Sequence, residues 1–362
     1  MVVRYSATIL GLIFLVSSGF GAEKFPKPDR APAETTAAHR EKIQEGLRLH
    51  DSRQFDAAIA IYSSVLAETP DDVRALYELA FTYFAKKDYQ NTISVVRQAI
   101  RYKSLLLGEL YSLLGNAYDD SGKADSAVDA YRAGIKVSPQ TALLYFNLGL
   151  AQSRAGKHVE AKGSLQEALL RNPNHATSHF LLASTYQRLG YKIPALMALS
   201  RYLLLQPDSR RAADAIVNLN EMVLGSVKSG DKPGNLVINL ALRPDSNKKN
   251  DEGDFGPTEL SVSIAVAAAQ MKDTKESPFS TIASAFSLLG ESISDVKGKG
   301  FAVRYYGPFF SELTKEKGRT EAFVNTVWQA QPPQGATEWR IGNEGAVQAF
   351  DQWLHSYSWP NK

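Results

Sequence analysis

The sequence predicts an all-α protein, in which a right-handed solenoid of helix-turn-helix units ends in a capping helix and is followed by a separate, mostly helical C-terminal domain. Two observations support this fold class. A pattern of small and large residues returns five times between residues 39 and 209, at intervals of 34, 35, 34 and 34 residues. Beyond the repeats, apolar residues recur every three or four positions in several further segments. A period of this length is typical of arrays in which similar units stack on one another.

Within each repeat, the spacing of small residues predicts two closely packed helices. The eighth position is always Gly or Ala, the twentieth is Ala or Thr, and large apolar residues stand at the twenty-fourth. Small residues allow two helix backbones to approach, and the large residues fill the adjoining space. Because one helix pair cannot bury its apolar side alone, stability has to come from stacking. The units start at His39, Val73, Gly108, Ala142 and Ala176.

Turn signals complete the unit. Gly122, Gly156 and Gly190 hold the fifteenth position of the last three units, where a permissive backbone suits a tight turn. Proline closes four of the five units, since it offers no N–H and its ring clashes with the preceding turn. These features resemble the tetratricopeptide repeat (TPR) family, whose helix-turn-helix unit has about 34 residues. The resemblance covers residues 39–209, in the units 39–72, 73–107, 108–141, 142–175 and 176–209.

The first two units depart most from the pattern. Lys42 and Glu45 introduce charge into the first unit, Ser104 replaces the closing proline of the second, and one extra residue lies near positions 105–107. These departures leave the exact ends of the array open but not its existence.

The first 22 residues have the layout of a secretory signal peptide. Arg4 precedes an uncharged stretch whose apolar centre spans residues 7–16, and small residues follow up to Ala22. The centre is short for a membrane-spanning helix, which needs about 20 apolar residues. We therefore expect an exported protein, periplasmic or secreted, with no membrane span after cleavage; an uncleaved N-terminal anchor is the alternative. Residues 23–38 contain three prolines and are expected to form a linker, or a leader without a role of its own.

Composition excludes several classes of function. The chain has 362 residues, with 41 basic and 38 acidic ones, so it lacks the strong positive charge of a nucleic-acid-binding protein. It has no cysteine, which excludes a disulfide scaffold, a lipid-anchored lipoprotein, cysteine nucleophiles and cysteine metal sites. The charge balance and the apolar fraction of 44% agree with ordinary packed cores.

The resemblance implies a concave groove as the candidate site. In the TPR arrangement, positions five, nine and twelve of each unit point into this groove, and here they are apolar or aromatic in units two, four and five and polar in unit three. We expect a partner's apolar side chains to bury against the aromatic residues, while two arginines one position further along either orient an acidic flank or are solvated. The candidate partner-binding residues are Tyr77, Phe81, Phe84, Asn116, Phe146, Leu150, Arg154, Phe180 and Arg188.

Two alternatives to an open apolar groove need weighing. TPR proteins that grip a C-terminal carboxylate use a lysine and an asparagine in the first unit, where this chain has Ile43 and Leu47, and Asn116 alone matches that residue type. A carboxylate clamp is therefore disfavoured. The other alternative is that the C-terminal half of the chain itself covers the aromatic stripe, which would make the protein a purely structural envelope component.

The remainder of the chain predicts a cap, a linker and a helical domain. Residues 210–225 form an amphipathic helix suited to closing the array. Residues 226–257 are expected to be a linker with a short strand near 235–242, and its polar part lacks the spacing of a calcium loop. Residues 258–362 predict an all-helical domain of unrecognised family, with helices near 259–271, 280–289, 303–317, 320–329 and 346–357.

No arrangement of residues indicates catalysis, a metal or a cofactor. His175 and His179 are four apart, but no carboxylate completes a metal-binding motif, so packing is the simpler explanation. The C-terminal domain has a single histidine, His355, and no phosphate-binding glycine loop. We therefore predict a non-enzymatic, exported scaffold or adaptor that binds a protein or peptide, with no nucleic acid and of undetermined oligomeric state. An enzymatic C-terminal domain served by the array is the alternative.

Overall fold

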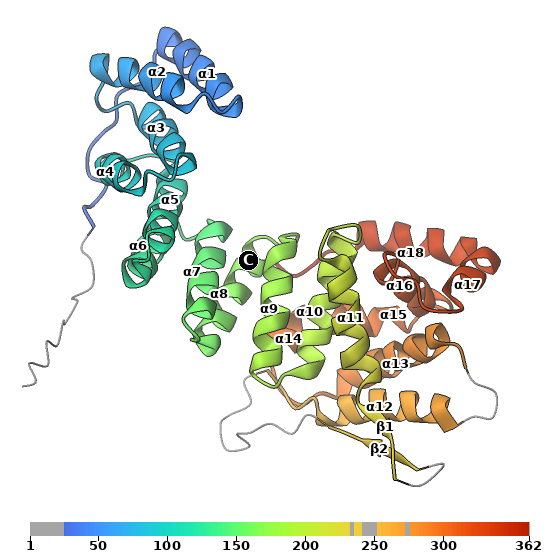
Figure 1. Cartoon of the computed structure of the whole chain (residues 1–362). Helices are drawn as coiled ribbons and strands as arrows, with labels where there is room; N and C mark the ends of the chain where they lie inside the picture. Colours follow the sequence, from blue (N-terminus) through green and yellow to red (C-terminus); the bar gives the residue numbers. More distant parts are fainter. Residues whose placement is uncertain (1–24, 232–234, 241–251, 272–275, 362) are drawn as a thin grey trace, which may run out of the picture.

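The computed structural model describes residues 25–231, 235–240, 252–271 and 276–361 (Figure 1). The predicted signal peptide therefore lies outside the described residues. Each of the five predicted units corresponds to one pair of helices, and a single helix follows the last pair. The helices are α1 (Ala37–Asp51), α2 (Phe55–Glu68), α3 (Val73–Ala85), α4 (Tyr89–Ala99), α5 (Leu107–Asp120), α6 (Ala124–Val137), α7 (Ala142–Arg154), α8 (His158–Arg171), α9 (Ala176–Arg188), α10 (Lys192–Leu205) and α11 (Ala212–Leu224).

The close packing within each unit depends on the small residues that the sequence pattern singled out. A Cβ atom added at Gly46 would lie 2.5 Å from the ring of Tyr62, and one at Gly149 would lie 2.8 Å from Leu165. The large residue at the twenty-fourth position of each of these units thus fills the space that the glycine at the eighth position leaves empty. The all-α repeat fold is confirmed.

The turn between the two helices has the same backbone conformation in all five units. Gly122, Gly156 and Gly190 have positive φ angles of 79°, 72° and 76°. Arg53 and Lys87 hold the same fifteenth position in the first two units, with φ angles of 60° and 63°. These two residues adopt a left-handed conformation that costs a non-glycine residue about 1 kcal/mol or more. The geometry of the unit therefore dictates the turn even where the sequence lacks glycine.

The described part of the proline-rich leader lies against the array. The ring of Phe25 meets that of Tyr111 edge-on at 5.7 Å, and the guanidinium of Arg97 lies 5.9 Å from the Phe25 ring. Arg30 pairs with Tyr102 in an isolated parallel bridge, at the loop where the second unit carries its extra residue. The leader is thereby attached to the second and third units.

The C-terminal region is helical apart from one short hairpin. Strands β1 (Val227–Ser229) and β2 (Leu236–Ile238) pair antiparallel, with Val227 opposite Ile238; the sequence predicted a strand only for the second. Its helices are α12 (Gly256–Met271), α13 (Pro278–Ser292), a 3₁₀ turn (Ile293–Asp295), α14 (Phe301–Tyr305), α15 (Gly307–Leu313), α16 (Arg319–Val327), α17 (Ala336–Gly342) and α18 (Glu344–Ser356).

Two helical segments differ from the prediction. The single helix expected over 303–317 is divided into α14 and α15, because Pro308 stands in the first turn of α15 and cannot continue the hydrogen-bond ladder of a preceding helix. The short helix α17 was not predicted, since it has only seven residues and begins after Gly335, whose φ is 93°.

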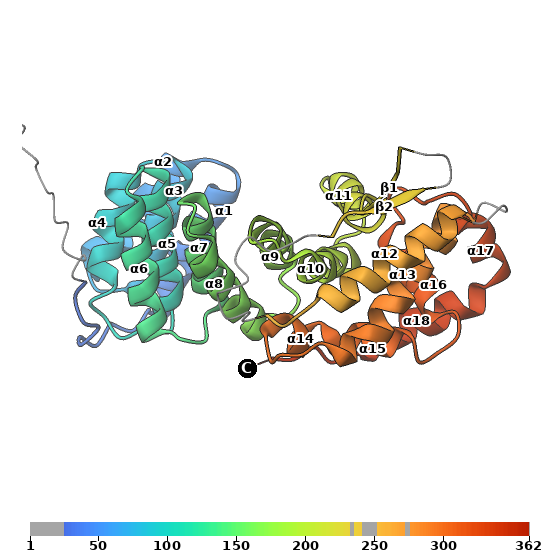
Figure 2. The same cartoon turned by 90° about the horizontal axis from the view of Figure 1, so that it is seen from below.

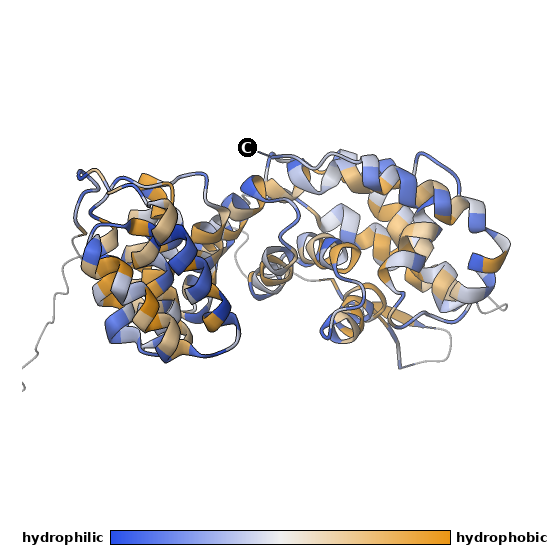
Figure 3. Ribbon diagram, turned by 90° about the horizontal axis from the view of Figure 1, so that it is seen from above, coloured by the Kyte–Doolittle hydropathy of each residue, from blue (hydrophilic) through white to orange (hydrophobic). Residues whose placement is uncertain are grey.

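The C-terminal helices and the last two units share one hydrophobic core. It runs without interruption from Leu165 and Leu169 of α8 through α10 and α11 to Trp328 and Trp359. Viewed from below, α12 to α18 extend to one side of α9 and α10, while α1 to α6 lie on the other side (Figure 2). Along the array, hydrophobic and hydrophilic stretches alternate within each helix (Figure 3), as expected of helices with one buried and one solvated side. No helix in the described ranges is both long and apolar enough to cross a membrane.

Candidate interaction surfaces

The first two units carry a stack of aromatic rings. Phe81 of α3 lies between His50 of α1, at a ring distance of 5.1 Å, and Tyr77 of its own helix, at 6.1 Å, and both pairs are stacked. His50 Nδ1 lies 2.9 Å from Thr82 Oγ1, which fixes the imidazole. Phe81 remains 41% exposed, and burial raises the pKa of the half-buried Tyr77 hydroxyl. This stack, His50, Phe81 and Tyr77, is a rigid apolar surface with one accessible ring.

The predicted aromatic stripe differs from the observed stack at two residues: it included Phe84 and omitted His50. Phe84 belongs to the predicted stripe, but its ring contacts Tyr89 of α4 at 5.8 Å rather than the stack. His50 was not among the candidate residues, although it stands at position twelve of the first unit. Its position in the unit was therefore the sequence signal that could have placed His50 among the candidates.

A polar belt separates the two apolar parts of the first-helix surface. Asn116 Oδ1 accepts hydrogen bonds from the Tyr131 hydroxyl at 2.7 Å and from Asn147 Nδ2 at 3.1 Å, and Asn147 also donates to Ser112 Oγ at 2.8 Å. Asn116 is therefore engaged within the array, between units three and four.

Arg154 pairs with Asp119 across the same two units. The charge of Arg154 beside the polar belt is therefore neutralised by Asp119. Arg188 is exposed in the last turn of α9.

The apolar candidates of units four and five are partly covered by the array itself. Phe146 meets His175 edge-on at 4.7 Å. Phe180 contacts Tyr202 at 5.1 Å, and the guanidinium of Arg211 lies 5.6 Å from its ring. Leu150 is half-buried. Within the described residues, the ring contacts of Phe146 and Phe180 do not extend to the stack of the first two units, so the nine candidates do not form one continuous stripe.

The C-terminal region meets the array mainly through the second helices of units four and five and through α11. Glu252 lies 3.3 Å from Lys162 and accepts from Gln166 Nε2 at 2.6 Å, both on α8. Trp328 Nε1 donates to Asn220 of α11 at 2.8 Å. Arg201 of α10 lies 4.3 Å from the ring centre of Trp359.

Self-occlusion of the groove would require residues 235–243 or the terminal helix to pack onto the array, and residues 241–243 lie outside the described residues. The described part of the first pairs with β1 and packs beside α12. Helix α18 packs on α16 and α17. The described parts of these two segments therefore do not cover the stack of His50, Phe81 and Tyr77, and they give no support to self-occlusion there.

His179 is a first-helix residue whose side chain reaches the C-terminal region. Its Nδ1 lies 2.7 Å from the Tyr306 hydroxyl and its Nε2 lies 3.0 Å from the Pro173 carbonyl oxygen. Complete burial lowers the pKa of His179 to about 3, so the imidazole is neutral at physiological pH. No group of three potential metal ligands occurs in the described ranges; part of the polar segment 244–257 lies outside them.

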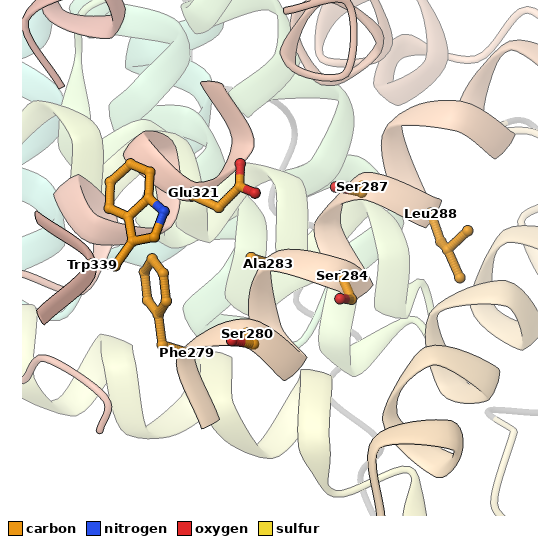
Figure 4. Close-up of a pocket in the computed structure, with 8 residues that line it drawn as sticks. All are labelled: Phe279, Ser280, Ala283, Ser284, Ser287, Leu288, Glu321 and Trp339. Atoms are coloured by element: carbon orange, nitrogen blue, oxygen red, sulfur yellow. The ribbon is translucent and has the colours of Figure 1, made fainter. Parts of the chain in front are cut away.

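The C-terminal region contains a hollow of about 340 Å³ away from the array helices (Figure 4). Three hydroxyl residues of α13, Ser280, Ser284 and Ser287, form one stripe along it, and Phe279 lies 5.5 Å from Trp339 of α17 at one end. Glu321 of α16 points into the same space. The lining includes no histidine, lysine or cysteine, so its chemistry suits binding rather than activation of a nucleophile. No pattern in the sequence indicated this hollow, because α17 was not predicted.

These observations define the class of the chain as an α-solenoid repeat protein, and comparisons then identify the repeat. Family models described as tetratricopeptide or TPR repeats match residues 49–99, 115–156 and 144–175. Residues 49–175 therefore contain repeats of the tetratricopeptide repeat family, as the sequence pattern indicated. A solenoid of this kind presents an extended surface for protein–protein interaction, and the array is a scaffold of that type.

Individual similar proteins match only part of the chain. The small glutamine-rich tetratricopeptide repeat-containing protein 2 of Mycosarcoma maydis is 27% identical over 114 residues, which are 31% of this chain and 32% of that protein. The chain thus spans about a third of the length of this curated relative.

Solved structures of similar proteins likewise cover about half of the chain. The structure of a thermophilic TPR protein of Thermus thermophilus has a TM-score of 0.40 at 22% identity and covers 51% of this chain and 99% of its own. MamA of Desulfovibrio magneticus has a TM-score of 0.42 at 15% identity, covering 49% and 99%.

Proposed function

We propose that the protein is an exported, non-enzymatic scaffold that binds an apolar peptide segment of a partner at the aromatic surface of its first two units. The observation that carries this proposal is the stack of His50, Phe81 and Tyr77. Its central ring is stacked with both neighbouring rings and is still 41% exposed. A rigid, accessible aromatic ring offers a partner apolar area at little cost in side-chain entropy.

The surroundings of the stack support an apolar partner. Unlike the stack, the middle of the array is occupied by the polar belt, whose asparagines and charged pair already have partners. A peptide would therefore gain apolar burial at the stack, at about 25 cal/mol per Å² of surface removed from water, and few new polar contacts at the belt. We expect affinity to depend on apolar anchor residues and only weakly on salt.

Export and the lack of catalysis belong to the same proposal. The N-terminal 22 residues have the composition of a cleaved signal peptide. Expression of the whole chain in a bacterial host, followed by N-terminal sequencing of the protein from each cell fraction, tests this part. A mature protein that begins after Gly21 or Ala22 in the exported fraction agrees with it, and an unprocessed protein in the cytoplasm contradicts it.

The binding proposal is tested with an array of immobilised peptides, each about 12 residues long, that vary in apolar and charged content. We expect the mature protein to retain peptides with several aromatic or aliphatic anchors, and Phe81→Ala to lose this retention. Leu143→Ala is the matched control, because Leu143 of α7 is also a partly exposed array residue, at 44%, but does not stand at a groove position.

Two results would count against the binding site. One is retention of the same peptides by Phe81→Ala and the parent protein. The other is an equal loss in Phe81→Ala and Leu143→Ala, which would indicate general adhesion of exposed apolar residues. Circular dichroism of each variant establishes that the array remains folded.

A further inference from the structure

The hollow between α13, α16 and α17 combines one acid, two aromatic rings and an apolar end. Its eight lining residues are Phe279, Ser280, Ala283, Ser284, Ser287, Leu288, Glu321 and Trp339. Glu321 is the only one of these with a formal charge. At about 340 Å³, the space is at the lower end of the range of ligand pockets and fits one long side chain or a similarly small ligand.

Three polar side chains of the hollow have no side-chain partner within the described part of the protein, whereas the Ser280 hydroxyl lies 3.0 Å from that of Ser277. Glu321 makes no ion pair or side-chain hydrogen bond with another described residue, and the same is true of the hydroxyls of Ser284 and Ser287. Buried polar groups in proteins generally find a partner in the protein or in water, and Glu321 and Ser287 are partly buried here. A carboxylate that faces a hollow without a protein partner is available to a ligand.

The hollow exists because three helices place small and large residues in a particular order. Ser280, Ser284 and Ser287 stand at i, i+4 and i+7 on α13, so short side chains leave a shallow track along that helix. Trp339 and Phe279, 5.5 Å apart and tilted by 39°, form a wall at one end, and Leu288 lies toward the other (Figure 4). Glu321 comes from the first turn of α16 and stands over the track.

We propose that this hollow receives a basic side chain, arginine or lysine, from an exposed segment of a partner protein. The apolar stem of the side chain would lie along Ala283 and Leu288, and its cationic head would meet the Glu321 carboxylate and the face of Trp339. Aromatic faces attract such cations, most strongly when the ring is an indole. A guanidinium also offers several donors to the serine hydroxyls. This inference is independent of the aromatic stack in the array.

A neutral ligand is the main competing possibility for such a lining. Hydroxyl groups beside an aromatic ring also suit a sugar, but a sugar would not need the lone carboxylate that stands over the track. The lining holds no cation that would neutralise Glu321. The charge of the site therefore favours a cationic group over a neutral one.

The test uses the mature full chain and blocked tripeptides observed by NMR. The probe is acetyl-Gly-Arg-Gly-amide, and its neutral counterpart carries citrulline in place of arginine. The indole N–H signal of Trp339 is assigned with Trp339→Phe. We expect the arginine peptide to shift this signal progressively, with a dissociation constant on the order of 1 mM for one side chain, and the citrulline peptide to leave it unchanged.

Variants separate the carboxylate from the shape of the hollow. Glu321→Gln is expected to weaken arginine binding about tenfold, which corresponds to the loss of one charged contact. Ser284→Leu, which fills the track from an exposed position, is expected to abolish the shift without loss of thermal stability. Glu338→Gln, an exposed acid on α17 that does not line the hollow, is the matched control and is expected to bind as the parent does.

Four outcomes would overturn the proposal. They are no shift of the Trp339 signal with the arginine peptide, an equal shift with the citrulline peptide, a shift with glucose in place of arginine, and equal weakening by Glu321→Gln and Glu338→Gln. The last would mean that net negative charge, and not this carboxylate, attracts the peptide.

Discussion

Helices α6 and α10 are both the second helix of a TPR unit and both have 14 residues, yet they are buried to very different extents. In α6, four residues are buried, all on the side that faces the array. In α10, the unbroken run from Ile193 to Leu203 is buried, including Arg201. A helix that is apolar on all sides is covered on all sides. The repeat pattern fixes the inner side of such a helix, while the outer side determines whether it faces water or another part of the chain.

This difference divides the array into two regions. Units one to three, apart from the leader on units two and three, keep their second helices exposed to solvent on the outside. Units four and five are continuous with the C-terminal helices through one core. We therefore expect the last two units and the C-terminal region to unfold together, and the first three units to respond separately.

The largest effect should come from Trp328→Ala. Trp328 is completely buried, donates to Asn220 of α11 and meets Phe286 of α13 edge-on. Its removal should lower the free energy of unfolding by about 3–5 kcal/mol. Hydrogen exchange should then show α10 and α13 losing protection together while α3 to α6 keep theirs. Loss of protection confined to the C-terminal helices would show that units four and five do not unfold together with them. The half-buried Trp339 is the control, and Trp339→Ala should cost clearly less.

A smaller loss is expected from Glu252→Ala. The buried Glu252 carboxylate pairs with Lys162 and also accepts from Gln166 and from the Ala302 N–H, the latter at 2.9 Å. Removing it eliminates a buried ion pair and the hydrogen bonds from Gln166 and Ala302, which should cost about 3 kcal/mol in urea denaturation.

The corresponding experiment in the other region is Asp119→Ala. It breaks the more exposed pair with Arg154 and should cost less than about 1 kcal/mol. Equal losses for the two acids would show that the interface with the C-terminal region is no more dependent on buried charge than the open part of the array. The double variant Lys162→Met/Glu252→Leu should recover most of the first loss.

Acid should weaken the region around His179 by about 2 kcal/mol between pH 7 and pH 5. The folded pKa of about 3 lies below the ordinary histidine value of 6.5 because burial disfavours the charged imidazole. Below pH 6.5 the unfolded chain therefore binds a proton that the native state does not, and stability falls as pH decreases toward 3. Urea titrations at several pH values measure the slope. His179→Gln should flatten it, and an unchanged slope would assign the effect to other groups.

The smallest effect is expected at the turns of the first two units. Lys87→Gly removes the strain of a left-handed residue and should stabilise the protein by about 0.5–1 kcal/mol. Gly156→Ala, at the same position of unit four, should destabilise it by a similar amount. If Lys87→Gly were destabilising, the gain in unfolded-chain entropy at glycine would outweigh the strain. Thermal unfolding of both variants provides the measurement.

Local patterns in the sequence were sufficient to predict the array. The small and large residues of the unit predicted close packing of its two helices, and the contact between Gly46 and Tyr62 is an example of that packing. The left-handed turn at Lys87 was not predicted, since glycine, asparagine and aspartate are the residues typical of that conformation and lysine is not. The run from Ile193 to Leu203 contained a signal for the second buried side of α10, but a repeat pattern draws attention to the inner side alone.

Contacts within one helix could be predicted from the sequence, whereas contacts between residues of several helices could not. Tyr77 and Phe81 lie one turn apart on one helix, so their stacking follows from spacing. The hollow requires Phe279, Glu321 and Trp339 from three helices to meet, and no sequence spacing encodes that meeting. Phe180 illustrates the intermediate case, because its position in the unit was clear while the covering by Arg211 depends on how α11 follows the array.

The attachment of the leader has a consequence for how the molecule can be held. Phe25 and Arg30 contact the second and third units, so the leader runs beside these units before it enters the first helix, α1. A group attached on the N-terminal side of Phe25 would hold the array near units two and three and not at one of its ends. A protein immobilised through that side would leave both the aromatic stack at one end and the C-terminal hollow at the other accessible to partners in solution.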